Sequence, residues 1–317
     1  MPSSLPPPTL LHLSLGLLFL LASIAAPRAT EAQTIKVTLL GTGCPPPVMN
    51  RFGPSTLVEA GNEKLVFDAG RGNLQRLVQA KVPLKDIHAL FLTHLHSDHV
   101  VGIPDMLLTG WLFGRREVPF RAWGPRGTKD MLTHLERAFE FDIRIRLYDD
   151  RPAPQGIVIL AEDIQQGVVY ERDGVKVTAF DVDHHPIKPA LGYRIDYGGR
   201  SVVLSGDTKF SENLIRFAQG ADVVIHSVAA PEVVQRGRPP ERAKAILDHH
   251  TLPEEAGTVF ARVQPKLAVF SHIVLPEATA QDLIPAARKH YGGHLELGED
   301  LDVIEVGETV TLHRAKP

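Results

Sequence analysis

The sequence predicts a layered α/β fold for residues 33–317. Apolar, strand-like runs alternate with segments of helical spacing, and no low-complexity linker divides the chain after Gln33. Of the 317 residues, 44% are hydrophobic and 22% are charged, a balance typical of a globular protein with a sizeable core. We therefore expect a single domain over residues 33–317.

The first half begins with an apolar-rich strand over Ile35–Leu40. Ser55–Glu59 and Lys64–Asp68 flank Gly61-Asn62, which indicates a hairpin. Helical spacing follows at Leu74, Leu77 and Val78. The next expected elements are a buried strand over Ile87–Thr93, a helix over Val100–Trp111 with Pro104 in its first turn, a strand over Phe120–Trp123 and a helix over Thr128–Phe139.

The second half contains further apolar runs of strand length. They are Val175–Phe180, Gly192–Tyr197, Ser201–Leu204, Val223–Ile225 and Leu267–Phe270.

Residues 1–32 differ in kind from the rest of the chain. Leu10–Ile24 is almost wholly apolar and precedes small residues, Pro27 and the stretch 29–32, which is typical of a secretory signal cleaved near Ala32. An apolar run of about 15 residues falls short of the ~20 needed to span a bilayer. We expect removal of this segment, no stable membrane anchor and export to the periplasm or the medium; a retained anchor is the alternative.

A single cysteine, Cys44, narrows the possible site chemistry. One thiol excludes an internal disulfide framework and a thiolate-rich metal site. Because Cys44 lies well beyond the expected cleavage point, it also argues against lipid anchoring.

The strongest functional signal is the motif Thr-His-Leu-His-Ser-Asp-His at 93–99, directly after a predicted buried strand. Side chains at i and i+2 of an extended segment point the same way, so His94 and His96 can share one ion. Beyond the strand, Asp98 and His99 can turn toward a second ion. Imidazole and carboxylate ligands suit zinc without any need for sulfur.

Potential ligands also follow four later apolar runs. Asp207 follows Val202–Leu204, His226 follows Val223–Ile225, and His272 follows Leu267–Phe270, while the run Val177–Val182 leads to His184 and His185. Functional groups of layered α/β proteins gather beyond the carboxyl ends of strands, so this repetition favours one shared site.

These motifs resemble the metallo-β-lactamase superfamily. The resemblance rests on Gly41-Thr42-Gly43, Phe67-Asp68-Ala69-Gly70, the motif at 93–99, Gly192-Tyr193-Arg194, Ser205-Gly206-Asp207-Thr208 and Phe270-Ser271-His272. It implies a four-layered αββα sandwich and a centre of two Zn²⁺ ions, with Mn²⁺ or Fe²⁺ as alternatives. By this resemblance His94, His96 and His184 bind one ion, Asp98, His99 and His272 bind the second, and Asp207 bridges the pair.

The resemblance also bears on His185 and Asp68, whereas the role of His226 stays open. His184 competes with His185, and the spacing to Gly192-Tyr193-Arg194 favours His184. Asp68 is expected to orient a ligand histidine rather than to bind metal. His226 is expected to support the ligands or to lie in the core.

The implied reaction is hydrolysis by a hydroxide held between two divalent ions, which acidify that water and polarise the substrate. Asp98 is expected to orient the hydroxide as well as to ligate. His250, in Asp248-His249-His250-Thr251, resembles the histidine that protonates the leaving oxygen in the ribonuclease Z branch. An exposed histidine at a helix start is the alternative.

The motif at 93–99 is typical of both ribonuclease Z and the secreted arylsulfatases of this superfamily. Ribonuclease Z usually carries a long arm between the Gly-Tyr-Arg and Ser-Gly-Asp-Thr motifs, and here only Ile195–Leu204 separate them. The net charge of −3 gives no reason to expect a nucleic-acid partner, and we interpret the basic segments 115–116 and 236–244 as solvated surface.

These points favour a small-molecule ester substrate, hydrolysed by an arylsulfatase-like activity, over nucleic acid. The alternatives are a phosphodiesterase or ribonuclease Z-like endonuclease, a lactone or β-lactam hydrolase, and a non-catalytic metal-holding binding protein. A homodimer is one candidate assembly.

Overall fold

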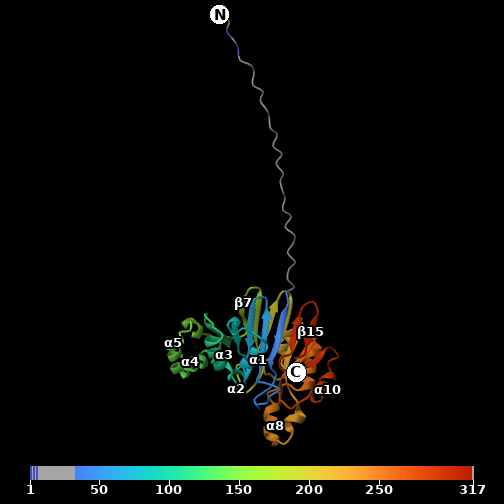
Figure 1. Cartoon of the computed structure of the whole chain (residues 1–317). Helices are drawn as coiled ribbons and strands as arrows, with labels where there is room; N and C mark the ends of the chain where they lie inside the picture. Colours follow the sequence, from blue (N-terminus) through green and yellow to red (C-terminus); the bar gives the residue numbers. More distant parts are fainter. Residues whose placement is uncertain (2, 4, 6–32, 316–317) are drawn as a thin grey trace. The chain divides into compact units, whose positions relative to one another are not determined.

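Two mixed β-sheets lie face to face in the computed structural model, which describes residues 1, 3, 5 and 33–315 (Figure 1). Residues Ala32–Pro317 form one compact unit. The predicted signal segment, 1–32, falls almost wholly outside the described residues and stays a prediction. None of the helices in the described part of the chain has the length and apolar composition needed to cross a membrane.

The first sheet has eight strands in the order β15-β14-β1-β2-β3-β4-β5-β6. Their bounds are β1 Ile35–Gly41, β2 Ser55–Ala60, β3 Glu63–Phe67, β4 Ala89–Phe91, β5 Phe120–Gly124, β6 Ile159–Asp163, β14 Val303–Val306 and β15 Val310–His313. β2 and β3 form the predicted hairpin, and Gly61 adopts the positive φ of 55° that its tight turn requires. β3 to β6 run parallel, so their carboxyl ends share one edge.

The second sheet has seven strands in the order β13-β12-β11-β10-β9-β8-β7. Their bounds are β7 Gly167–Arg172, β8 Val175–Asp181, β9 Leu191–Tyr197, β10 Arg200–Leu204, β11 Val223–Ala229, β12 Leu267–Val274 and β13 Leu295–Leu297. β10 to β13 run parallel. β9 and β10 are joined by the two-residue turn Gly198-Gly199, so no arm leaves the molecule between them.

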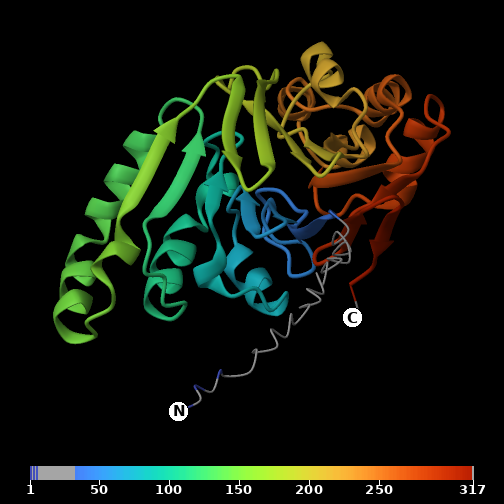
Figure 2. The same ribbon diagram turned by 90° about the horizontal axis from the view of Figure 1, so that it is seen from above.

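Helices cover the outer side of each sheet. On the first sheet lie α1 Asn73–Gln79, α2 Ser97–Val100, α3 Ile103–Leu112, α4 Thr128–Ala138 and α5 Glu140–Asp149, with the short 3₁₀ turns η1 Leu84–Asp86 and η2 Pro154–Ile157. With the second sheet lie α6 Glu212–Ala218, α7 Pro231–Gln235, α8 Pro240–Leu247, α9 Pro253–Val263 and α10 Ala280–Arg288. Figure 2 shows the helices of the two halves on opposite sides of the paired sheets.

Three apolar clusters hold these layers together. One lies between the sheets and includes Val37, Phe91 and Ile225, each at most 5% exposed. A second joins the first sheet to its helices through residues such as Trp111, and a third joins the second sheet to α6–α10 through residues such as Phe260. Each buried aliphatic or aromatic side chain contributes roughly 1.5–3 kcal/mol. The predicted αββα sandwich is confirmed.

Candidate metal centre

The candidate centre lies where the carboxyl ends of β4 and β10 meet across the two sheets. The extended segment after β4 carries His94 and His96, and α2 then begins and carries Asp98 and His99. The Leu191 N–H donates to the Thr93 carbonyl (2.8 Å), which ties this segment to the second sheet. Asp207 follows β10 through Gly206, whose φ of 61° and close approach to the Leu191 carbonyl leave no room for a Cβ atom.

His272 reaches the centre through a β-bulge. The β11–β12 register shifts so that Ser227 pairs with Ser271 and Val228 pairs with Ile273, which leaves His272 as the extra residue. Its φ of 44° lies in the left-handed region. A bulge re-aims one side chain of a strand, and here it turns the His272 imidazole toward two carboxylates. His272 Nε2 lies 3.3 Å from Asp207 Oδ2 and 3.4 Å from Asp98 Oδ2.

All seven residues expected as ligands are brought together. Their potential ligand atoms form three groups, each with all atoms within 4.8 Å of one another: His94, His96 and His184; His94, His99 and Asp207; and Asp98, His99 and His272. Every one of the seven is buried except His96, which is partly exposed.

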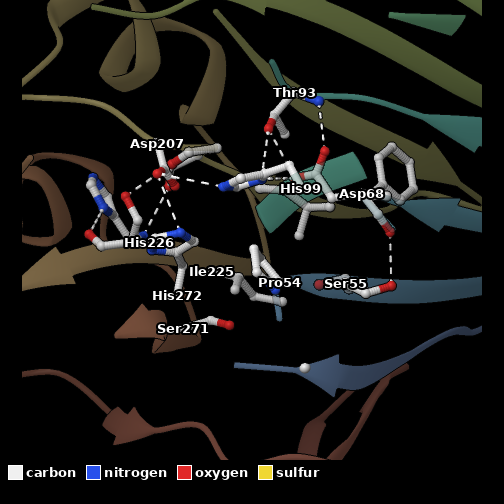
Figure 3. Close-up of a pocket in the computed structure, with 17 residues that line it drawn as sticks. Pro54, Ser55, Asp68, Thr93, His99, Asp207, Ile225, His226, Ser271 and His272 are labelled. Carbon is white, nitrogen blue, oxygen red and sulfur yellow. Dashed lines mark hydrogen bonds and ion pairs between the residues drawn. The ribbon is translucent and has the colours of Figure 1, made fainter. Parts of the chain in front are cut away.

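Asp68 orients His99 rather than joining the ligand groups. Its carboxylate accepts hydrogen bonds from the Thr93 N–H, the Thr93 hydroxyl and His99 Nδ1, each at 2.8 Å. Figure 3 shows this chain from Thr93 through Asp68 to His99, and beyond His99 the Asp207 carboxylate. With Nδ1 donating to Asp68, His99 presents Nε2 to Asp98 and Asp207, at 3.6 Å from each.

The structure brings His184, and not His185, to the centre. His184 is fully buried, whereas His185 is exposed. His184 Nδ1 donates to the His249 carbonyl (2.8 Å), so Nε2 faces the cluster, 3.9 Å from Asp207. The positioning role of His249 was missed in the sequence, although its place beside His250 could have drawn attention to it.

Burial keeps the imidazoles of His94, His96 and His184 neutral. It lowers the pKa of His94 well below the ordinary value, lowers that of His96, and lowers that of His184 to about 4. His94 Nε2 and His96 Nδ1 lie 2.9 Å apart. Two nitrogens bound to one tetrahedral zinc ion with bonds of about 2.0–2.1 Å would lie roughly 3.3–3.4 Å apart, so a small shift would make room for an ion between them.

The two carboxylates stay ionised despite their burial. Burial alone would raise the pKa of Asp207, but His272 and His99 hold it well below the usual range. Burial would likewise raise the pKa of Asp98, but His272 and His99 lower it below the ordinary value. Burial would lower the pKa values of His99 and His272. The carboxylates outweigh this effect: Asp68 and Asp207 raise the pKa of His99, and Asp207 raises that of His272.

Several buried atoms of this group have no hydrogen-bond partner within the described part of the chain. They are His99 Nε2, His184 Nε2, Asp207 Oδ1 and both ring nitrogens of His272. A buried polar atom without a partner costs about 1–3 kcal/mol, and all of these atoms belong to residues of the three ligand groups. The donor set therefore fits divalent cations of the zinc type.

His226 and Cys44 lie beside the centre but are not among the ligand groups. His226 is buried within β11, donates from Nδ1 to the Ser227 carbonyl (2.7 Å), and packs edge-on against Phe260. Burial lowers its pKa to about 4. Burial, with Asp98 and Asp207, raises the pKa of the Cys44 thiol, so Cys44 stays protonated.

A cleft of about 280 Å³ opens from the ligands to the surface. His96, Asp98, Asp207 and His272 line it, together with His250. Its other walls are formed by Cys44, Pro45, Pro46, Arg238, Arg242, Ile246, His249, Val274 and Leu275.

His250 is buried rather than exposed. Its Nδ1 donates to the Ile246 carbonyl (2.7 Å), and its Nε2 lies 3.6 Å from Asp207 Oδ2. The alternative of an exposed histidine at a helix start is therefore wrong, and Nε2 is directed at the carboxylate that would bridge the ions.

Comparison with known families matches residues 63–273 to the family described as the β-lactamase superfamily domain. A ribonuclease Z of Mycolicibacterium gilvum is 37% identical over 278 residues, which cover 86% of this chain and 96% of the relative. A ribonuclease Z of Mycolicibacterium paratuberculosis is 39% identical over 278 residues, covering 86% and 98%.

Solved structures share the fold. The metallo-β-lactamase fold protein YhfI of Bacillus subtilis superposes with a TM-score of 0.66 at 19% identity, covering 86% of this chain and 99% of that one. The short form of human tRNase Z gives 0.64 at 21% identity, covering 85% and 98%.

The prediction of a small-molecule ester as partner, with nucleic acid disfavoured, is contradicted by these relatives, whose name denotes cleavage of RNA. The absence of a long arm between the Gly-Tyr-Arg and Ser-Gly-Asp-Thr motifs was a poor criterion. The 278 aligned positions cover 86% of the 317 residues of this chain and 96% of the relative, so the relative has no long insertion either. The net charge of −3 was equally poor, because it averages over a surface on which arginines line the cleft.

Proposed function

The chain belongs to the β-lactamase superfamily, and on that premise we propose that it is a dinuclear zinc phosphodiesterase that cleaves RNA, as its relatives' name, ribonuclease Z, describes for them. Membership makes it a metal-dependent hydrolase of the metallo-β-lactamase fold. What we propose beyond this membership is that the centre holds two zinc ions, that the bond cleaved is a phosphodiester and that the substrate is RNA.

In this proposal His94, His96 and His184 would hold one ion and Asp98, His99 and His272 the other, and Asp207, which groups with His94 and His99, would be a ligand of both. The ions, when bound, acidify water and stabilise the charge that develops on the phosphoryl oxygens. Metal binding requires neutral imidazoles and ionised carboxylates. His94, His96 and His184 are neutral and Asp207 is ionised, so these four residues meet the requirement.

Asp98 and His250 have the two proton-handling roles. Asp98 lines the cleft, 3.4 Å from His272, and can accept a hydrogen bond from the attacking water and so orient it. His250 has Nδ1 fixed on the Ile246 carbonyl, so only Nε2 faces the cleft and can donate a proton to the leaving oxygen. A single-stranded RNA backbone offers such a leaving oxygen at every phosphodiester.

The observation that carries the proposal is the convergence of seven ligand-type side chains in a chain that matches ribonuclease Z relatives over almost their full length. The test is to incubate the zinc-loaded protein with a labelled RNA oligonucleotide, bis(4-nitrophenyl) phosphate, 4-nitrophenyl sulfate, a lactone and a β-lactam. We expect cleavage of both phosphodiesters. Turnover of the sulfate ester or the acyl substrates, with both phosphodiesters left intact, would refute the proposal.

We also propose that residues 1–32 direct export and are then removed. The apolar run Leu10–Ile24 and the small residues before Gln33 support this. Amino-terminal sequencing of the protein from the periplasm or the medium should begin near Gln33; an intact Met1 on protein recovered with the membrane fraction would contradict removal.

A further inference from the structure

Two arginines that the metal centre does not use line the cleft on the side of α7 and α8. Arg238 and Arg242 share the cavity of about 280 Å³ with His96, Asp98 and Asp207. Both belong to the basic segment 236–244, for which the sequence predicts a solvated surface. Because they lie beside the candidate metal centre, these two arginines can contact a molecule bound in the cleft.

Arg238 is partly buried and held by the main chain. Its Nη1 donates to the carbonyls of Val233 (3.3 Å) and Val234 (3.2 Å), which belong to α7. A guanidinium has five N–H donors in a planar fork, so these contacts occupy one nitrogen and leave the rest of the fork for another acceptor. Within residues 33–315, no carboxylate forms an ion pair with Arg238 or Arg242.

Arg242 lies on α8, one turn before Ile246, and both residues line the cleft. Residues four apart lie on the same helix face, so α8 turns this face toward the cleft, and its last turn is followed by His249 and His250. The other cations of the segment differ. Lys244 pairs with Asp248, and neither Lys244 nor Arg236 is among the residues that line the cleft.

We propose that Arg238 and Arg242 form a second phosphate subsite, which binds the backbone phosphate next to the scissile one in an RNA chain. This inference rests on the proposed function. The planar guanidinium fork matches phosphate oxygens, and the two carboxylates that share the cavity, Asp98 and Asp207, belong to the candidate metal centre. A cavity of this size, near the lower end of ligand pockets, accommodates about one nucleotide unit beside the metal centre.

The subsite predicts a preference for polyanionic chains over isolated diesters. A single diester such as bis(4-nitrophenyl) phosphate reaches the metal centre but has no second phosphate for the arginines. The test compares Arg238→Ala, Arg242→Ala and the control Arg236→Ala, which removes the same charge from the same segment outside the cleft. Each zinc-loaded variant is assayed with a labelled RNA oligonucleotide and with bis(4-nitrophenyl) phosphate at several salt concentrations.

We expect KM for the oligonucleotide to rise about tenfold in each cleft variant, while kcat/KM for the single diester changes less than about twofold. The slope of log kcat/KM against log salt for the oligonucleotide should fall by about 0.7 per arginine, as expected for one lost phosphate contact on a single strand. Arg236→Ala should match the unaltered protein in both respects.

Equal losses on both substrates, or an equal change in Arg236→Ala, would overturn the subsite and leave the phosphodiesterase proposal standing. Binding of the same oligonucleotide is measured in parallel by fluorescence anisotropy. If the protein cleaves no phosphodiester yet binds RNA through Arg238 and Arg242, the proposed function fails while the subsite stands. Binding that depends on neither arginine overturns the subsite.

Discussion

Replacing Asp68 with asparagine should weaken zinc binding at the centre although Asp68 is not in any ligand group. The Asp68 carboxylate accepts three hydrogen bonds of 2.8 Å, and one of them fixes the ring of His99. An asparagine amide of the same size can accept from the Thr93 N–H, but its NH₂ group cannot accept from His99 Nδ1. His99 would then lose the partner that sets its tautomer and its orientation.

Loss of such a supporting contact typically costs 10- to 100-fold in metal affinity, which is about 1.4–2.7 kcal/mol. We expect this loss for the weaker-binding of the two ions, measured by competition with a chromophoric chelator. Asp300→Asn is the control away from the ligand groups: Asp300 is also buried and accepts from the Thr42 N–H, the Thr42 hydroxyl and the Phe52 N–H, and it forms an ion pair with Arg76 as well (2.9 Å).

Both substitutions should lower the stability of the metal-free protein in urea unfolding, since both remove charge-assisted hydrogen bonds, and Asp300→Asn should lower it more because it also breaks the ion pair with Arg76. Only Asp68→Asn should lower zinc affinity. A zinc affinity of Asp68→Asn within about twofold of that of the unaltered protein, or an equal loss in Asp300→Asn, would contradict the orienting role of Asp68.

Four further outcomes are expected. Asp207→Ala should reduce the metal content from about two ions per chain to less than one, because Asp207 groups with His94, an expected ligand of one ion, and with His99, an expected ligand of the other; elemental analysis that still finds two ions would contradict this. His250→Ala should slow aryl phosphodiesters with poor leaving groups far more than activated ones, and an equal loss across the leaving-group series would exclude the proton-donor role. Chelation of the metal should lower the thermal midpoint by about 5–10 °C, since a ligand at 100 times its Kd contributes about 2.7 kcal/mol; an unchanged melting curve would show that the metal does not stabilise the native state. Phe91→Ala, in the cluster between the sheets, should cost about 3–5 kcal/mol in denaturant unfolding, and a loss below about 1 kcal/mol would contradict its place at the centre of that core.

The parts of the site that follow from local pattern could be predicted, and those that depend on register could not. The motif at 93–99 places its ligands by strand alternation and a following helix, both of which are local. His272 is different. The apolar run ends at Phe270, whereas β12 continues to Val274, and the bulge that aims His272 exists only because β11 pairs beside it.

Helix α5 shows a similar limit in the fold. Its sequence alternates apolar and polar residues over 141–147, a pattern with the period of a strand. In the structure Ile143 and Leu147, four residues apart, pack against the first sheet's outer cluster, while Phe141 and Ile145 remain exposed. Tertiary packing of one pair of side chains decides the outcome here, and no local rule identifies which pair it will be.

The substrate was the point on which sequence reasoning failed, and the fold explains why. The ligands sit on strand ends and on α2, where sheet hydrogen bonds and buried contacts such as Asp68 to His99 fix them. Most of the remaining cleft wall comes instead from the segment before α8, from α8 with the turn that follows it, and from the loop around Pro45, none of which is a strand. The metal chemistry and the substrate preference therefore depend on different elements. Only the metal chemistry has a contiguous sequence motif, at residues 93–99. A whole-chain charge cannot report on the substrate preference, because solvent screens distant charges, and a molecule in the cleft experiences mainly the charges that line it, which include Arg238 and Arg242.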